Sequence, residues 1–300
     1  MQESLRSPNV HTPKDFAQLQ SILVSYPEAT YWAGGGWIMS RPDCYPMPTT
    51  NNEIIWLGEI EEMTRFQRND RVAEFGAMVS LNEILTSGKN ILPGIITDNI
   101  RSLGGTIITE KITLGGALAT KGFRSSIAGT LAITDTSCEI KYLRKKRLHS
   151  KWVPLSTLYD KNGNISLPQH GLISRVRIQL SDRTWQRYRS EGSFLLHPEN
   201  AVSVAFSGSP EKDTITDARL SVTYPNLGFV ASRDMDNMIS SVRFPLNRQE
   251  SQSLIDGIMG LVTSHLSISP LQRVRTLGIL RNLIGEINIE ALSGPLGEKG

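Results

Sequence analysis

Two runs of consecutive glycines, each beside apolar residues, most constrain how this 300-residue chain can fold. Gly34-Gly35-Gly36 follows the segment Thr30-Tyr31-Trp32-Ala33, and Gly115-Gly116 follows Ile112-Thr113-Leu114. Glycine loses more backbone entropy on folding than any other residue, so a run of it is favourable only where the backbone needs positive φ or close approach by another group. We interpret each run as a loop after an apolar strand, whose N–H groups form a nest for a phosphate or pyrophosphate. A tight turn at either run is the open alternative.

The spacing of these glycines excludes two common phosphate sites. A Rossmann unit needs Gly-x-Gly-x-x-Gly at the start of a long helix, and a phosphate-binding loop needs Gly-Lys followed by Ser or Thr. Neither pattern occurs at these runs. Two loops about eighty residues apart indicate instead one ligand held between them.

Composition and charge exclude several classes of function. With 39% hydrophobic and 20% charged residues, the chain is a globular protein long enough for two or three domains. A net charge of +3 is too small to indicate a nucleic-acid partner. The cationic segment 144–147 is predicted to be a solvated hairpin tip, because no aromatic residues are interleaved with it to stack on bases.

The two cysteines exclude a metal redox centre in this chain. Cys44 and Cys138 are far apart, whereas iron–sulfur clusters and four-thiolate zinc sites need closely spaced thiolates, so any metal redox chemistry belongs to another chain. The polar first 13 residues contain no apolar segment of signal-peptide length, and no run approaches the roughly 20 apolar residues of a membrane span. We expect a cytoplasmic protein with no membrane partner.

Apolar spacing in the first half predicts an alternation of helices and strands. The predicted elements are a helix over 14–26 capped by Thr12, a strand at 54–57 buried on both faces, a hairpin over 63–78, a helix at 81–86 capped by Ser80, and a helix at 94–102 opened by Pro93.

Beyond the second glycine run, strands come first and helices follow. The pattern predicts a helix or strand from 131 running into a strand that ends at 143, a hairpin tip at 144–147, two strands within 165–180, and a boundary near 181–183. It then predicts antiparallel strands at 201–207 and 215–222 joined by a loop at 208–214, and helices at 248–266 and 271–287. This order favours an α+β fold.

The two glycine runs resemble the flavin loops of a known family. Ala33-Gly34-Gly35-Gly36-Trp37-Ile38 resembles the first loop, A-G-G-T-D/S-L, of the FAD-binding medium subunit of molybdenum hydroxylases of the xanthine dehydrogenase and carbon monoxide dehydrogenase type. Thr113 to Thr120 resembles the second loop, T-I-G-G-N-L/I-A-T. Similar segments follow the family's order over most of the chain, at 75–83, at 147 with 152–155, at 200–206 and at 273–287.

The resemblance implies a fold, a cofactor and a set of site residues. The fold would be α+β, with a PCMH or vanillyl-alcohol-oxidase-like FAD-binding domain over 1–181, made of subdomains at about 1–60 and 61–181. A small α+β C-terminal domain with antiparallel strands and helices would cover 182–300. FAD would be held by Ala33, Gly34, Gly35, Gly36, Trp37, Ile38, Thr113, Gly115, Gly116, Ala117 and Thr120.

The resemblance also implies an electron-transfer role in a larger complex. The flavin would receive electrons from iron–sulfur clusters of a partner subunit and pass them to NAD or another acceptor, while a molybdopterin subunit oxidises the substrate. Both loops would bind the FAD pyrophosphate through backbone N–H groups. The protein would tune the flavin rather than supply acid–base chemistry, so we expect no catalytic side chain and no metal site here.

Some positions depart from the family pattern. Gly36 and Trp37 stand where the family has Thr and an acidic or hydroxyl residue, Ala117 replaces Asn, and no carboxylate occurs near 125–128. Three lost side-chain hydrogen bonds would weaken FAD binding by about 2–5 kcal/mol. The alternative function is therefore a non-enzymatic scaffold subunit with weak or lost FAD binding. A free-standing flavin oxidase is a third hypothesis. Trp37 itself is predicted to fill space in the core, with stacking on the cofactor as the other interpretation.

Overall fold

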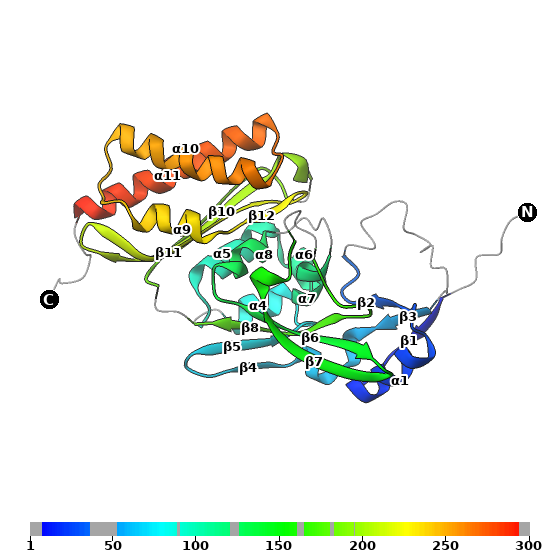
Figure 1. Ribbon diagram of the computed structural model, residues 1–300. Helices are drawn as coiled ribbons and strands as arrows, with labels where there is room; N and C mark the ends of the chain where they lie inside the picture. Colours follow the sequence, from blue (N-terminus) through cyan, green and yellow to red (C-terminus); the bar gives the residue numbers. More distant parts are fainter. Residues whose placement is uncertain are drawn as a thin grey trace, which may run out of the picture.

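The computed structural model describes residues 8–36, 53–88, 91–120, 126–160, 165–180, 183–194 and 196–293. It contains three separate β-sheets with helices packed between and outside them, which confirms the predicted α+β class (Figure 1). No helix in the described ranges is long and apolar enough to cross a membrane.

The first sheet is small and parallel. It places β3 (Glu53–Trp56) between β1 (Asn9–His11) and β2 (Thr30–Trp32), beside α1 (Phe16–Ser25). The N-cap of α1 is Asp15, whose carboxylate accepts the Gln18 N–H at 2.8 Å, so the expected Thr12 cap is wrong. The strand at 54–57 is buried on both faces only in part, because Trp56 is 36% exposed and Leu57 already begins the 3-10 helix η1 (Leu57–Glu59).

The second sheet is antiparallel, with strand order β4-β5-β8-β6-β7. After the short helix α3 (Glu61–Thr64), the predicted hairpin is confirmed as β4 (Phe66–Arg68) and β5 (Val72–Gly76). The cationic segment is the tip of a second hairpin, β6 (Ser137–Arg144) and β7 (Arg147–Pro154), followed by η2 (Leu155–Thr157). Only one full strand, β8 (Leu172–Gln179), occupies 165–180, since Ile165 forms no more than an isolated bridge to Tyr159.

Five helices lie between this sheet and the four-stranded sheet that follows (Figure 1). Ser80 caps the first of them, α4, in a capping box with Glu83, as predicted, and the next begins directly after Pro93. The five are α4 (Leu81–Ser87), α5 (Gly94–Leu103), α6 (Thr106–Lys111), α7 (Leu114–Ala119) and α8 (Ile127–Ala132).

The expected strand before the second glycine run, Ile112-Thr113-Leu114, is wrong, because Thr113 forms no more than an isolated bridge to Ser80 and Leu114 already begins α7. The second run is therefore the first turn of a helix and not a loop. The residues before it form another helix, α6, in which Ile107 is 83% exposed. The helix begins directly after Gly104-Gly105, where Gly104 has a φ of 149° that an L-residue rarely adopts. The first glycine run does follow a strand, β2.

The third sheet has strand order β12-β11-β10-β9 and is antiparallel. Its central strands are longer than predicted, and the loop expected at 208–214 is only the two-residue turn Lys212-Asp213. Helices α9–α11 cover the face of this sheet that is turned away from the other helices (Figure 1). The elements are β9 (Trp185–Glu191), η3 (Pro198–Asn200), β10 (Val202–Glu211), β11 (Thr214–Tyr224), β12 (Gly228–Val230), α9 (Arg233–Ser240), α10 (Arg248–His265) and α11 (Pro270–Ser293).

Two hydrophobic clusters form the core. The first cluster consists of buried residues between Leu19 and Ile178, together with Tyr188 and Ala205. The second consists of buried residues of the third sheet and of helices α9–α11. Between them, the buried guanidinium of Arg183 bonds to Asp135 at 2.7 Å and to Asp217 at 2.7 Å. The domain and subdomain boundaries at 181 and 60 stay predictions.

Candidate functional site

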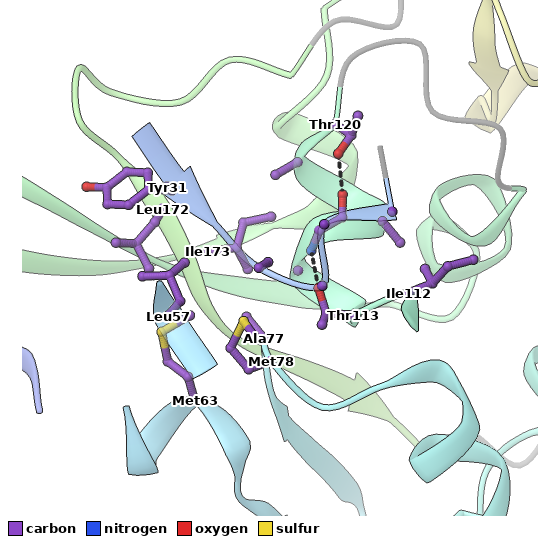
Figure 2. A pocket seen from close by; sticks show the side chains of 18 of the residues that line it. Tyr31, Leu57, Met63, Ala77, Met78, Ile112, Thr113, Thr120, Leu172 and Ile173 are labelled. Carbon is purple, nitrogen blue, oxygen red and sulfur yellow. Dashed lines mark hydrogen bonds between the residues drawn. The ribbon is translucent and has the colours of Figure 1, made fainter. Parts of the chain in front are cut away.

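The two glycine runs meet at one pocket. The first run leaves the end of β2, and the second forms the start of α7, so both reach the pocket from one side, while β8 forms an opposite wall (Figure 2). The pocket has a volume of about 360 Å³, in the range of small-molecule sites. Its lining is Tyr31, Ala33, Gly34, Gly35, Gly36, Leu57, Met63, Ala77, Met78, Lys111, Ile112, Thr113, Gly115, Gly116, Ala117, Ala119, Thr120, Leu167, Gly171, Leu172 and Ile173.

The three glycines of the first run differ in how strongly the surrounding structure requires a residue without a side chain. A β-carbon on Gly34 would overlap the main-chain carbonyl oxygen of Lys111, so Gly34 allows the two loops to touch. Gly35 has a φ of 74°, in the left-handed region. The nearest atom to a β-carbon on Gly36 would be the Lys111 carbonyl oxygen at 3.9 Å, so this position is open. Only Gly34 and Gly35 are therefore required by the described fold itself.

The backbone donors of the second run are already in use. The N–H of Leu114 donates to Val79 O at 2.9 Å, that of Gly115 to Ala77 O at 2.8 Å, and that of Gly116 to Thr113 Oγ1 at 3.3 Å. The Thr120 hydroxyl donates to Gly116 O at 2.7 Å (Figure 2). Gly115 also packs closely, since a β-carbon there would lie 2.5 Å from Ala77 Cβ. The second run thus contributes a rigid wall rather than a free nest.

The donors of the first run are different. The main-chain N–H groups of Ala33, Gly34 and Gly35 donate to no other residue that the structure describes. Three successive donors at one edge of a pocket suit the oxygens of a phosphate or pyrophosphate. In the described lining, the expected anion contact through backbone N–H groups is therefore possible at the first run.

The other end of the pocket is apolar. Leu57, Met63, Met78 and Leu172 project into it around Tyr31, whose hydroxyl donates to His170 O at 2.9 Å (Figure 2). Burial raises the pKa of Tyr31 above its ordinary value, so its phenol stays neutral. Such a wall suits a flat aromatic group.

Charge is scarce in this pocket. Lys111 is the only Lys, Arg, His, Asp or Glu residue among the lining residues that the structure describes. The buried Cys138 thiol does not line it, and burial raises the pKa of that thiol to about 12, so it is a thiol at neutral pH. Within the described ranges no group of three or more His, Cys, Asp or Glu residues could hold a metal ion. The site can bind and orient a ligand, and its described lining supplies no carboxylate or imidazole for proton transfer.

Nine of the eleven expected site residues line the pocket. They are Ala33, Gly34, Gly35, Gly36, Thr113, Gly115, Gly116, Ala117 and Thr120. Trp37 and Ile38 lie outside the described residues, so neither interpretation of Trp37 is tested.

Sequence reasoning missed most of the apolar wall. Tyr31, Leu57, Met63, Leu172 and their neighbours reach the pocket from four separate parts of the chain, and only the fold brings them together. The segment 75–83, already noted for its resemblance, was the available signal for Ala77 and Met78.

The region that follows the second run uses its polar groups internally. Ser126 is fully buried, and its hydroxyl donates to Asn99 Oδ1 at 2.8 Å and lies 2.7 Å from the Tyr188 hydroxyl. Asn99 in turn donates to Thr130. This network joins α5 and α8 to β9 of the third sheet, so Ser126 acts in domain packing.

Comparisons with known proteins agree on one family. A family model described as the FAD binding domain in molybdopterin dehydrogenase matches residues 4–179. The solved structure of quinoline 2-oxidoreductase from Pseudomonas putida 86 matches with a TM-score of 0.73 at 15% identity, covering 98% of this chain and 100% of that one. Carbon monoxide dehydrogenase from Hydrogenophaga pseudoflava gives 0.77 at 12% identity, covering 96% and 98%. Reconstituted CO dehydrogenase from Oligotropha carboxidovorans gives 0.75 at 14% identity, covering 96% and 99%. At these identities the structural likeness shows the fold. No curated protein matches the chain.

Proposed function

Because this chain belongs to the family of FAD-binding domains of molybdopterin dehydrogenases, whose model matches residues 4–179, we propose that it is the electron-transfer flavin subunit of a molybdenum hydroxylase-type oxidoreductase complex. FAD is the cofactor of this family. The observation that carries the proposal is the pocket in which the two glycine runs meet, with backbone donors at one end that bond to no other described residue and an apolar wall at the other end.

The residues present fit the two chemical parts of a flavin dinucleotide. The N–H groups of Ala33, Gly34 and Gly35 would bind the pyrophosphate, and Gly36 leaves room for its approach. Thr113, Gly115, Gly116, Ala117 and Thr120 would form the wall behind it. The apolar end around Tyr31 and Met78 would receive an aromatic ring of the cofactor.

The chain's own contribution is binding and orientation. FAD, when bound, supplies electron transfer, which needs no protein nucleophile or general base. The hydrogen bonds that hold Leu114 and Gly115 to Val79 and Ala77 fix the position of the second run before any ligand arrives. The largely apolar lining around Tyr31 and Met78 would exclude water from a bound ring.

The finer parts of this function are proposals as well. We propose an iron–sulfur subunit and a molybdopterin subunit as partners, NAD or another acceptor as the destination of the electrons, and xanthine dehydrogenase-type enzymes as the nearest functional relatives. The cytoplasmic location and the division into domains at 1–181 and 182–300 stay part of the proposal.

A scaffold subunit with weak or lost FAD binding is the second candidate. It is favoured by Gly36 and Ala117, which lack the side-chain donors of the family pattern, and by the internal use of the donors of Gly115 and Gly116. Either function preserves the fold, so only cofactor occupancy separates them.

The discriminating experiment is a spectrum followed by a titration. The purified chain is recorded between about 350 and 500 nm, and the flavin-free chain is then titrated with FAD by flavin fluorescence. Flavin bands, or saturable FAD binding, support the flavin subunit. A chain with neither, in the presence of its partners as well as alone, supports the scaffold.

A further inference from the structure

The hairpin β6–β7 concentrates the positive charge of the chain. Residues 140–151 contain six Lys and Arg residues and no acidic residue. The whole chain has 32 basic and 29 acidic residues, so without this hairpin the basic residues would number 26 and the balance would be negative. Arg144, Lys145, Lys146 and Arg147 form its exposed tip.

The charges at the tip are not neutralised by the fold. Lys141, at the base of the hairpin, pairs with Glu139 at 3.5 Å and lies 4.2 Å above the Phe16 ring. By contrast, none of the four tip residues forms an ion pair with another residue in the described part of the chain. Six cations on two short strand segments repel one another, so this arrangement is unfavourable for the isolated chain.

The tip also uses residues that its backbone disfavours. Lys145 and Lys146 have φ values of 50° and 63°, and both belong to the left-handed region. Two-residue hairpin turns of this type prefer Asn or Asp followed by Gly, because most L-residues are disfavoured in the left-handed region, which Gly adopts without a β-carbon and Asn or Asp tolerate through local hydrogen bonds of their short side chains. Turn stability therefore does not explain two lysines at this position, whereas an external anionic partner would.

We propose that this hairpin tip is a docking site for an acidic segment of a partner polypeptide. Arginine and lysine donate charge-assisted hydrogen bonds to carboxylates, and Arg144 and Arg147 flank the turn where two such contacts are within reach of one segment. β7 is an edge strand, so the tip stands clear of any further strand on that side. Figure 1 shows the hairpin running up to α1, at the end of the molecule away from α9–α11.

The local chemistry favours a polypeptide over other anions. The aromatic side chains of the hairpin already have partners, since the Tyr142 ring stacks on His149 at 5.8 Å and the Trp152 ring faces Arg177 at 4.0 Å, which leaves no free platform for bases. No residue from 140 to 151 is among the exposed large hydrophobic residues, so the tip offers nothing to insert into a lipid surface.

The test uses the full chain and a fluorescein-labelled peptide of ten glutamates, measured by anisotropy over a salt series. The double substitution K145N/K146G removes two charges and gives the turn its preferred residues. We expect at least tenfold weaker peptide binding with an equal or higher Tm, so that loss of binding is not loss of folding. The flavin pocket contains no residue of this hairpin, so the result is independent of whether the chain binds FAD.

A matched control is available in the other hairpin turn. Lys212 has a φ of 53° and lies between Glu211 and Asp213. K212N removes one charge and relieves the same kind of strain, and we expect unchanged peptide binding. The proposal is overturned if the wild-type chain does not bind the peptide, if K145N/K146G binds it equally well, or if K212N weakens binding as much. Tip-dependent binding to a ten-nucleotide single strand or to phosphatidylserine vesicles that exceeds binding to the peptide would also overturn it.

Discussion

The α-carbon of Gly34 rests against the main-chain carbonyl of Lys111, so closely that a β-carbon on Gly34 would overlap that oxygen. This contact joins the first glycine run to the residue that ends α6, just before the second run. The two halves of the pocket are thus held together by backbone packing and not only by a ligand.

Gly34→Ala is expected to separate the two loops. The added methyl group must displace the backbone at Lys111, and such overpacking costs about 1–3 kcal/mol of folding free energy. We expect FAD affinity, measured by flavin fluorescence, to fall at least about tenfold, because the backbone N–H donors of the first run move with the loop. The matched control is Gly36→Ala in the same run, whose β-carbon has open space, and its free energy of unfolding in urea is expected to stay within about 0.5 kcal/mol of wild type. Equal stability losses in both variants would contradict this account of Gly34.

Gly36→Thr tests whether the divergent loop has lost cofactor contacts. The position has room for a side chain, and the family pattern places Thr there. A new hydroxyl donor to the cofactor is worth about 0.5–1.5 kcal/mol, so FAD affinity should rise roughly threefold to tenfold. Gly36→Val adds a similar volume without the hydroxyl and is expected to give no gain. If neither variant binds FAD more tightly than wild type, the first loop does not contact the cofactor as proposed.

The sequence predicted the parts of this structure that depend on local chemistry. Ser80 and Glu83 have the spacing of a capping box, and they form one at the start of α4. Both glycine runs line the pocket, and they could be predicted as site residues because few other functions favour such runs. Prediction from the sequence failed where contacts between distant segments decide the structure. The segment Ile112-Thr113-Leu114 resembled a strand although Leu114 begins α7. The apolar wall around Tyr31 consists of residues that resemble ordinary core residues until four distant segments meet.

Tyr188→Phe tests the polar network that joins the third sheet to α5 and α8. The Tyr188 hydroxyl lies 2.7 Å from Ser126 Oγ and accepts from Ser102 Oγ at 3.1 Å, inside the protein. Removing it breaks the hydrogen bonds with Ser126 and Ser102, each worth about 0.5–1.5 kcal/mol, so we expect a loss of about 1–3 kcal/mol in the free energy of unfolding, measured in urea. Tyr142→Phe is the control, because the Tyr142 hydroxyl bonds to no other described residue, and a change below about 0.5 kcal/mol is expected. A Tyr188→Phe protein as stable as the control would show that this network adds nothing to folding.

Glu139 is expected to make stability depend on pH in the acidic range. Burial alone would raise the pKa of this carboxyl, but hydrogen bonds from Arg175, Ser150 and Ser174, with the charge of Lys141, outweigh burial and lower the pKa to about 2. In the unfolded chain the same group titrates near 4.5. A carboxyl whose pKa is lower in the folded state stabilises the protein fully above its unfolded pKa, and that contribution disappears as the pH falls from about 4.5 toward about 2. At 1.36 kcal/mol per pKa unit, the contribution at neutral pH is about 3 kcal/mol. Glu139→Gln should therefore unfold at lower urea concentration at pH 7 and show a flatter dependence of stability on pH between about 4.5 and 2.

Glu211→Gln, at an exposed position beside the Lys212 turn, should leave both the midpoint and the pH profile unchanged. An identical pH profile for Glu139→Gln and wild type would mean that Glu139 does not carry this acid sensitivity.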